Sequence, residues 1–227
     1  MRYPLVIFDW DGTLMDSTGR IVDCLRYAAE ELSLPSLPDS RLREIIGLGL
    51  PEAVQSLWPM LSEADNERMR QKYANYFIAA ESEPNALFPG AEELLTTLRD
   101  TNVLLAVATG KSRKGLTRVW QNTGYGHFFD LSICADESRS KPDPAMLHAL
   151  LQGTATAPAD AVMIGDTSFD MDMARAAGVA GIAVSYGAHD AHRLRASQPL
   201  ALIDSLYELP AHLITGDATT LTMTLQG

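Results

Sequence analysis

The sequence predicts an α/β fold in which a parallel β-sheet is interrupted, after its first strand, by an all-helical segment. Three observations support this prediction. Short continuous apolar runs recur along the chain, stretches with helical periodicity separate most of them, and one long stretch has no run typical of a strand. Alternating strands and helices are typical of a parallel sheet with right-handed crossovers.

The continuous apolar runs predict strands buried on both faces, because helices cover both faces of a parallel sheet. The predicted strands are residues 5–8, 103–108, 131–134, 161–164 and 181–184. Helical patterns fall between them at residues 91–99, 113–123, 144–151 and 169–177. Gly178 follows the last of these helices, where a glycine commonly ends a helix.

The segment between Met15 and Glu83 contains no convincing strand and predicts a helical insertion. Residues 21–32 form an amphipathic pattern, and further helices are predicted at 42–46, 51–58 and 63–80. We therefore expect residues 1–14 and 85–227 to form the sheet domain and residues 15–84 to form the inserted domain. The two crossings, near residues 14 and 87–90, are the natural hinge. The Thr-rich tail at 215–227 is expected to be an edge strand or disordered.

Bulk composition narrows the range of partners. The formal net charge of −11 argues against non-specific nucleic-acid binding, which needs basic side chains to neutralise phosphates. No run approaches the roughly 20 apolar residues of a membrane span, and the first apolar run is too short for a signal peptide. Cys24 and Cys134 form no disulfide or zinc pattern, so we expect a cytoplasmic protein. The sequence leaves a monomer and a homodimer open.

Two carboxylates follow the first predicted strand, in Asp9-Trp10-Asp11-Gly12-Thr13. Ligands of open parallel sheets sit at the carboxyl ends of strands, so this position is a candidate site. Gly12 permits a sharp turn there. The alternative interpretation is a capped turn in which Asp11 binds local backbone amides.

A second acidic pair follows the fourth strand, where Asp166 and Asp170 stand about one helical turn apart. Alone, the pair fits a structural role, with Asp166 as a helix cap and Asp170 favouring the helix dipole, as well as it fits a functional one. If the first and fourth strands are neighbours, Asp9, Asp11, Asp166 and Asp170 converge. Four carboxylates cannot all stay ionised in one cleft unaided, so we expect a hard divalent cation, Mg²⁺, among them.

Two further strand-end segments could bind an anion. Thr109-Gly110 ends the second strand and offers a hydroxyl and free backbone amides, although a plain Thr cap is equally consistent. Lys141 lies in a loop stiffened by two prolines and could act as a fixed positive charge. An exposed surface position is the more common place for a lysine.

Together these motifs resemble the haloacid dehalogenase-like hydrolases, in order and in context, over nearly the whole chain. The matching residues are Asp9-Trp10-Asp11-Gly12-Thr13, Thr109, Lys141-Pro142 and Gly165-Asp166-Thr167-Ser168-Phe169-Asp170. The resemblance implies a Rossmann-like core of five parallel strands in the order 5-4-1-2-3. It also implies that the inserted helices form a cap like that of the subfamily holding phosphoglycolate phosphatase and beta-phosphoglucomutase.

The resemblance implies a Mg²⁺-dependent phosphatase that acts on small phosphorylated metabolites, such as phosphoglycolate-like or sugar phosphates. Asp9 would attack phosphorus and form an aspartyl-phosphate, and Asp11 would act as acid and then base. Asp9 and Asp166 would bind the metal through side chains, Asp11 through its carbonyl, and Asp170 through water or as an orienting group.

The remaining implied roles concern the phosphoryl group. Thr109 and the Gly110 amide would hold its oxygens, and Lys141 would offset the charge of Asp9 and phosphate. Two departures from the family pattern occur: Trp10 stands where an aliphatic residue is common, and Gly110 replaces a common Asn.

Alternatives remain open. The founding dehalogenases lack an acid two residues after the nucleophile, so Asp11 favours phosphate esters. A phosphomutase shares the same core motifs, and a non-enzymatic metabolite-binding or regulatory module is a third possibility. Substrate choice is expected to lie in the inserted domain, at the loop holding Gly47 and Gly49 and at Arg43; a plain interhelical turn is the alternative. His189 and His192, three residues apart, could bind a metal, but two lone histidines are more often surface residues and are interpreted as such.

Overall fold

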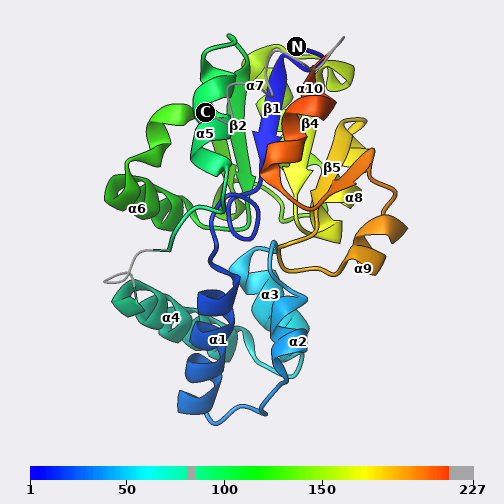
Figure 1. The fold of residues 1–227 in the computed structure, drawn as a ribbon. Coiled ribbons are helices and arrows are strands. Elements are labelled where there is room, and N and C mark those ends of the chain that lie inside the picture. The colour runs from blue at the N-terminus through cyan, green and yellow to red at the C-terminus, as the bar shows by residue number, and fades with distance from the viewer. Residues whose placement is uncertain (81–84, 215–227) are drawn as a thin grey trace.

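The computed structural model describes residues 1–80 and 85–214, and its core is one six-stranded parallel sheet in the order β3-β2-β1-β4-β5-β6 (Figure 1). The strands are β1 Leu5–Phe8, β2 Leu104–Thr109, β3 Leu131–Cys134, β4 Ala161–Gly165, β5 Ala180–Val184 and β6 Ala201–Ile203. The expected α/β class and the implied neighbours of the first five strands are confirmed. The expectation of five strands was incomplete, because β6 extends the sheet beside β5.

Helices cover both faces of the sheet, as the apolar strands require. They are α5 Ala91–Arg99, α6 Arg113–Thr123, α7 Ala145–Thr154, α8 Ser168–Ala177, α9 Ala191–Ala196 and α10 Leu209–Leu213. Short 3₁₀ helices lie at Tyr125–Phe128, Ala135–Glu137, Pro158–Asp160 and Leu206–Glu208.

Alternate side chains of β1 enter two separate apolar layers, because successive strand residues point to opposite faces. Val6 and Phe8 pack with α5 and α10, whereas Leu5 and Ile7 pack with α7 and α8. All four side chains are fully buried. This arrangement fixes β1 in the middle of the sheet and directs its carboxyl end, at Asp9, toward the inserted helices (Figure 1).

The insertion consists of α1 Thr18–Glu31, α2 Asp39–Arg43, α3 Leu50–Leu57 and α4 Glu63–Ala80. These helices pack around their own apolar cluster, and Figure 1 shows them as a group beyond one end of the sheet. An isolated bridge between Met15 and Leu87 joins the two chain crossings. The prediction of a helix at 42–46 was wrong, since α2 begins after Pro38 and ends at Arg43, ahead of Gly47 with its φ of 100°.

None of the described helices is both long and apolar enough to cross a membrane. The expectation of an edge strand or disorder at 215–227 falls outside the described residues.

Candidate active site

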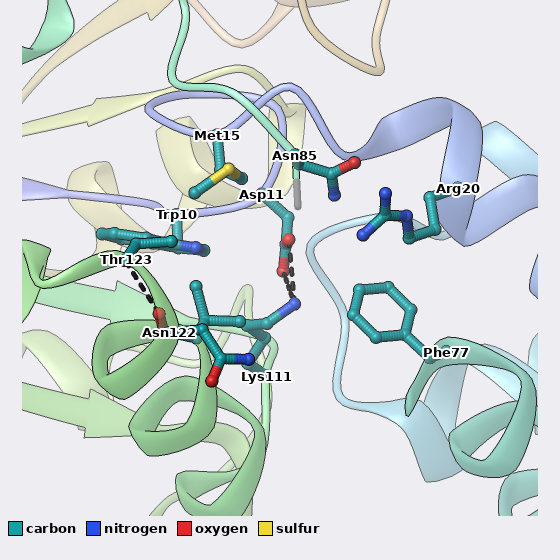
Figure 2. A pocket seen from close by; sticks show the side chains of 10 residues that line it. Trp10, Asp11, Met15, Arg20, Phe77, Asn85, Lys111, Asn122 and Thr123 are labelled. Atoms are coloured by element: carbon teal, nitrogen blue, oxygen red, sulfur yellow. Dashed lines mark hydrogen bonds and ion pairs between the residues drawn. The ribbon is translucent and has the colours of Figure 1, made fainter. Parts of the chain in front are cut away.

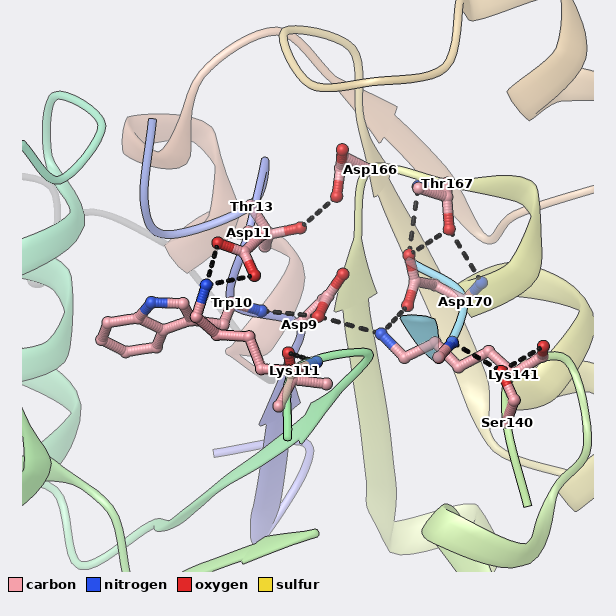
Figure 3. A network of polar contacts seen from close by, with 12 residues as sticks. Asp9, Trp10, Asp11, Thr13, Lys111, Ser140, Lys141, Asp166, Thr167 and Asp170 are labelled. Atoms are coloured by element: carbon pink, nitrogen blue, oxygen red, sulfur yellow. Dashed lines mark hydrogen bonds and ion pairs between the residues drawn. The ribbon is translucent and has the colours of Figure 1, made fainter. Parts of the chain in front are cut away.

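Three carboxylates meet at the carboxyl ends of β1 and β4 (Figure 3). Asp9 and Asp166 directly follow these neighbouring strands, and the Asp9 amide donates to the Ile164 carbonyl at 2.9 Å. Asp170 lies in the first turn of α8, which begins immediately after the Asp166 turn. Each residue offers a carboxylate oxygen, all within 4.8 Å of one another, and all three are buried. Parallel register therefore brings Asp9 together with two acids that follow it by 157 and 161 residues in the sequence.

Lys141 lies between two of these carboxylates. Its Nζ is 2.9 Å from Asp9 Oδ1 and 2.7 Å from Asp170 Oδ1, and its side chain is fully buried. Burial alone would lower the pKa of Lys141, but the charges of Asp170 and Asp9 outweigh it and raise that pKa. The predicted fixed charge is therefore placed inside the site, and the exposed alternative is wrong.

Burial raises the pKa of Asp9 well above its ordinary value; Lys141 opposes this rise, and Asp170 and Asp166 add to it. Burial, followed by the charge of Asp170, raises the pKa of Asp166 to about 7. The Ala188 amide, at 2.7 Å, and the Thr13 hydroxyl, at 2.8 Å, donate to Asp166 and oppose that rise. Both shifts follow from burial and from the crowding of carboxylates in this site.

A divalent cation fits this donor set. Three buried carboxylates face one ammonium, which leaves an excess of negative charge that a hard cation with oxygen ligands relieves. Among the described residues, Asp9 Oδ2 is buried without a hydrogen-bond partner, so one oxygen of the cluster is available for a ligand. Gly12 and Gly187 border Asp166 so closely that a Cβ at either position would overlap its carboxylate.

The Asp11 carboxylate lies apart from this cluster, so the expected convergence of four carboxylates is only partly met. Both Asp11 oxygens are 3.0 Å from Lys111 Nζ (Figure 3). The Ser17 hydroxyl donates to Oδ1 at 2.6 Å. The cause is local: Gly12 turns the chain with a φ of 86°, and Lys111, at the end of β2, supplies the nearer cation. Metal contact by the Asp11 carbonyl stays a prediction.

Lys111 was not singled out from the sequence, although its place after Thr109-Gly110 at a strand end was a usable signal. Its Nζ also lies 4.5 Å from the centre of the Phe77 ring on α4, a cation–π contact with the insertion. Figure 2 shows Lys111 between Asp11 and Phe77, beside a small cavity that Arg20 also lines.

A larger cavity of about 150 Å³ lies between the strand ends and the inserted helices. Asp9, Asp11, Thr109 and Gly110 line its core side, so the structure places these predicted residues around one space. Thr109 is fully buried, and its Oγ1 accepts a hydrogen bond from the Lys111 amide at 3.2 Å.

The loop between α2 and α3 closes onto the strand ends. Gly47 lines the cavity, and the Gly49 amide donates to the Ser140 hydroxyl at 2.8 Å. A Cβ at Gly110 would lie 2.5 Å from the Leu48 carbonyl oxygen and 2.7 Å from that of Gly47, so glycine permits this approach. The Asn common at that position in the family would collide with the loop. Arg43 is exposed at the end of α2, and it is not among the cavity-lining residues.

His189 also joins the core to the insertion, so its interpretation as a surface residue was wrong. It is only 3% exposed, and its Nδ1 accepts from the Ser168 amide at 2.9 Å. Its Nε2 lies 3.1 Å from the Glu44 carbonyl oxygen and therefore carries the proton that Glu44 accepts. No sequence pattern links positions 44 and 189, so only the folded chain reveals this contact.

Comparison with known proteins identifies the family. A family model described as haloacid dehalogenase-like hydrolase matches residues 6–184. The probable phosphatase IndB of Dickeya dadantii is 32% identical over 91% of each chain. A phosphoglycolate phosphatase of Nitrosococcus oceani is 30% identical over 90% of this chain and 94% of the relative.

The name of another relative gives a different substrate, and a solved structure shares the fold. An N-acetylmuramic acid 6-phosphate phosphatase of Pseudomonas putida is 31% identical over 82% of this chain and 85% of the relative. The crystal structure of a hydrolase from Pseudomonas syringae superposes with a TM-score of 0.84 at 26% identity, covering 92% of this chain and 96% of that one. The motifs, the fold and these matches agree, and the chain belongs to the haloacid dehalogenase-like hydrolase family.

Proposed function

We propose that this chain is a phosphoric monoester hydrolase that uses Asp9 as nucleophile and Mg²⁺ as cofactor to act on small phosphorylated metabolites. The observation that carries the proposal is the position of Asp9: its unpartnered Oδ2 belongs to a buried acidic cluster, and the residue also lines a cavity with Thr109 and Gly110. Relatives named as phosphatases support the reaction class.

The side chains of Asp9 and Asp166 would hold Mg²⁺, with Asp170 orienting the cluster through its contact with Lys141. When bound, the ion would neutralise negative charge on the phosphoryl group and the surrounding carboxylates. Lys141 already neutralises part of this charge, so the carboxylate of Asp9 can stay ionised despite its burial.

The reaction then proceeds in two steps, in which different side chains act. The Asp9 carboxylate attacks phosphorus, the ester P–O bond breaks, and the departing alcohol takes a proton from the protonated form of Asp11. In the second step Asp11 removes a proton from water, which attacks phosphorus and releases phosphate and the Asp9 carboxylate. Thr109 and the Gly110 amide hold the phosphoryl oxygens, positions from which they can stabilise the charge of the transition state.

Residues 15–84 act as a cap domain over the core formed by residues 1–14 and 85–227. The apolar cluster of the helices, distinct from those of the sheet, supports this division. Contacts of the Gly47–Gly49 loop with Gly110 and Ser140 support a closed state in which the cap shields the reaction from bulk water.

Phosphate release from a panel of small phosphate monoesters, measured with Mg²⁺ and with EDTA, tests the proposal. We expect turnover with Mg²⁺ and none with EDTA. Turnover should fall by about 10⁴-fold or more in Asp9→Asn. Asp160→Asn, at an exposed position between α7 and β4, is the matched control and should retain wild-type turnover. Full activity of Asp9→Asn would overturn the assignment of the nucleophile.

A further inference from the structure

The cavity between core and cap has two chemically different walls. The core wall carries the charged and hydrogen-bonding groups: Asp9, Asp11, Thr109, Lys111, Ser112 and Arg118. The cap wall is built from Ile21, Leu25, Ile45, Ile46, Gly47, Leu48, Leu50, Ala53, Tyr73, Ala74 and Phe77. Since the core wall faces the phosphoryl group, the cap wall faces the rest of the substrate.

The cap wall is apolar across several elements. Ile21 and Leu25 are four residues apart on α1, and Tyr73 and Phe77 are four apart on α4, so each pair forms one helical stripe toward the cavity. Among the described lining residues, the cap contributes no charged side chain, and the Tyr73 hydroxyl is its one polar side-chain group.

The cations nearest this wall are already engaged. Lys111 is held by both oxygens of Asp11 and lies over the Phe77 ring. Arg118, on the core side, has an interaction of its own. Arg20 lines the smaller neighbouring cavity of about 30 Å³ instead. An anionic leaving group would therefore meet apolar side chains without a dedicated partner, which is costly for a charge.

We propose that the alcohol released by this enzyme is uncharged and largely apolar, an inference that rests on the proposed phosphatase function. The cavity, apolar on its cap side, measures about 150 Å³, which is large enough for a molecule the size of benzene. Because the phosphoryl group occupies part of this space, the leaving group is a short branched chain or a small ring. This substrate class differs from the acidic alcohol that relatives named phosphoglycolate phosphatase release.

Two phosphate esters of nearly the same shape test the inference. Isobutyl phosphate and 2-phosphoglycolate differ in that two methyl groups replace two carboxylate oxygens. We expect kcat/KM to be about 10-fold or more higher for isobutyl phosphate, the discrimination typical of small differences in an apolar pocket. Glycolate is intrinsically the better leaving group, so chemistry alone would favour the opposite order.

A charge placed on the cap wall should shift this preference. Ile21→Arg introduces a cation at a position that is 8% exposed and lines the cavity. The kcat/KM ratio of isobutyl phosphate to 2-phosphoglycolate should fall by about 10-fold or more in this variant. Ile78→Arg makes the same substitution on α4 at a position that is 44% exposed, and should leave the ratio unchanged.

Acetyl phosphate, measured alongside, separates failure of the inference from failure of the function. Hydrolysis of acetyl phosphate that Asp9→Asn abolishes would uphold the phosphatase, whatever the ester preference. Equal rates on the two esters, preference for 2-phosphoglycolate, or turnover of neither ester would each overturn the inference. The wild-type ratio of kcat/KM for the two esters is enough to test the inference. The test therefore does not depend on whether Ile21→Arg folds.

Discussion

Two lysine–carboxylate pairs stand at the same end of the sheet and differ in how they are enclosed. Lys141 is fully buried between Asp9 and Asp170, at 2.9 and 2.7 Å. Lys111 is paired with Asp11 at 3.0 Å, and its side chain is 10% exposed. Every partner of Lys141 belongs to the core, whereas Lys111 also contacts Phe77 of the cap helix α4.

This difference indicates two different duties. A fully buried pair cannot exchange its partners for water, so Lys141 holds a permanent charge balance in the acidic cluster. Lys111 lies at the boundary between core and cap, and its contact with Phe77 would change if the cap moved. We therefore expect Lys141 to support the chemistry of the acidic cluster and Lys111 to link the position of Asp11 to the cap.

Replacement of Lys141 should give the largest effect. Lys141→Met leaves buried carboxylates without their cation, and the pKa of Asp9 then rises further, which converts the nucleophile to its inert protonated form. We expect turnover to fall by about 10³-fold or more, which corresponds to roughly three pKa units or more of lost interaction. We also expect the free energy of unfolding in urea to fall by about 3–5 kcal/mol. Near-wild-type turnover in a folded variant would contradict the assigned charge balance.

Replacement of Lys111 should separate catalysis from stability. Lys111→Met removes a pair whose side chains are 10% and 11% exposed, so we expect a smaller loss of stability than in Lys141→Met, whose pairs are fully buried. Turnover should fall about 10–100-fold because Asp11 loses the group that orients it. Lys114→Met, at an exposed position on α6, is the control. If Lys111→Met loses as much stability as Lys141→Met, the two lysines do not differ as argued.

Metal binding should stabilise the protein through the buried carboxylates around Lys141 and not through the Lys111–Asp11 pair. Mg²⁺ at 100 times its dissociation constant should stabilise the wild type by about 2.7 kcal/mol relative to EDTA, seen as a higher thermal midpoint. Asp166→Asn removes one of the three clustered carboxylates and should lose most of this gain. Asp11→Asn, whose side chain lies outside the cluster, should retain most of it. Equal losses in both variants would contradict the separation of the two acidic groups.

The neighbourhood of Asp9 and Asp166 was predictable because parallel register and the order of the strands place the two strand ends side by side. The short apolar runs placed each acid at the end of a strand, whereas the order that makes these two strands neighbours came from the family resemblance. The direction of the Asp11 side chain was not predictable, since it depends on the turn at Gly12 and on competition between two lysines. Rules about strands do not decide which lysine pairs with which acid.

The other differences between the sequence predictions and the structure also arise from tertiary contacts. Residues 201–203 have only a weak strand pattern of their own. They form a short strand because they pair with β5. His189 is buried because the cap covers it at Glu44, a contact across 145 positions. The close approach of the cap loop to Gly110 also depends on domain packing, although a glycine there was a noticeable departure from the family pattern.

Replacement of His189 should give the smallest effect. This side chain joins the core to the cap and is uncharged at neutral pH. Burial lowers the pKa of His189 below 6.5, Arg193 lowers it further, and the Glu44 carbonyl bond and the charges of Asp170 and Glu44 oppose this shift. Below about pH 6.5 the unfolded chain therefore binds a proton that the folded chain does not.

This histidine contributes stability that is fully present above pH 6.5 and is lost as pH falls toward its lowered folded pKa. We expect the stability difference between wild type and His189→Gln to shrink on acidification, by at most about 1.4 kcal/mol per pH unit. Urea unfolding in EDTA at several pH values measures it, and taking the difference cancels the titration of Asp166. His148→Gln, at an exposed position on α7, is the control. A difference that stays constant from pH 8 to pH 5 would show that His189 is not held neutral between core and cap.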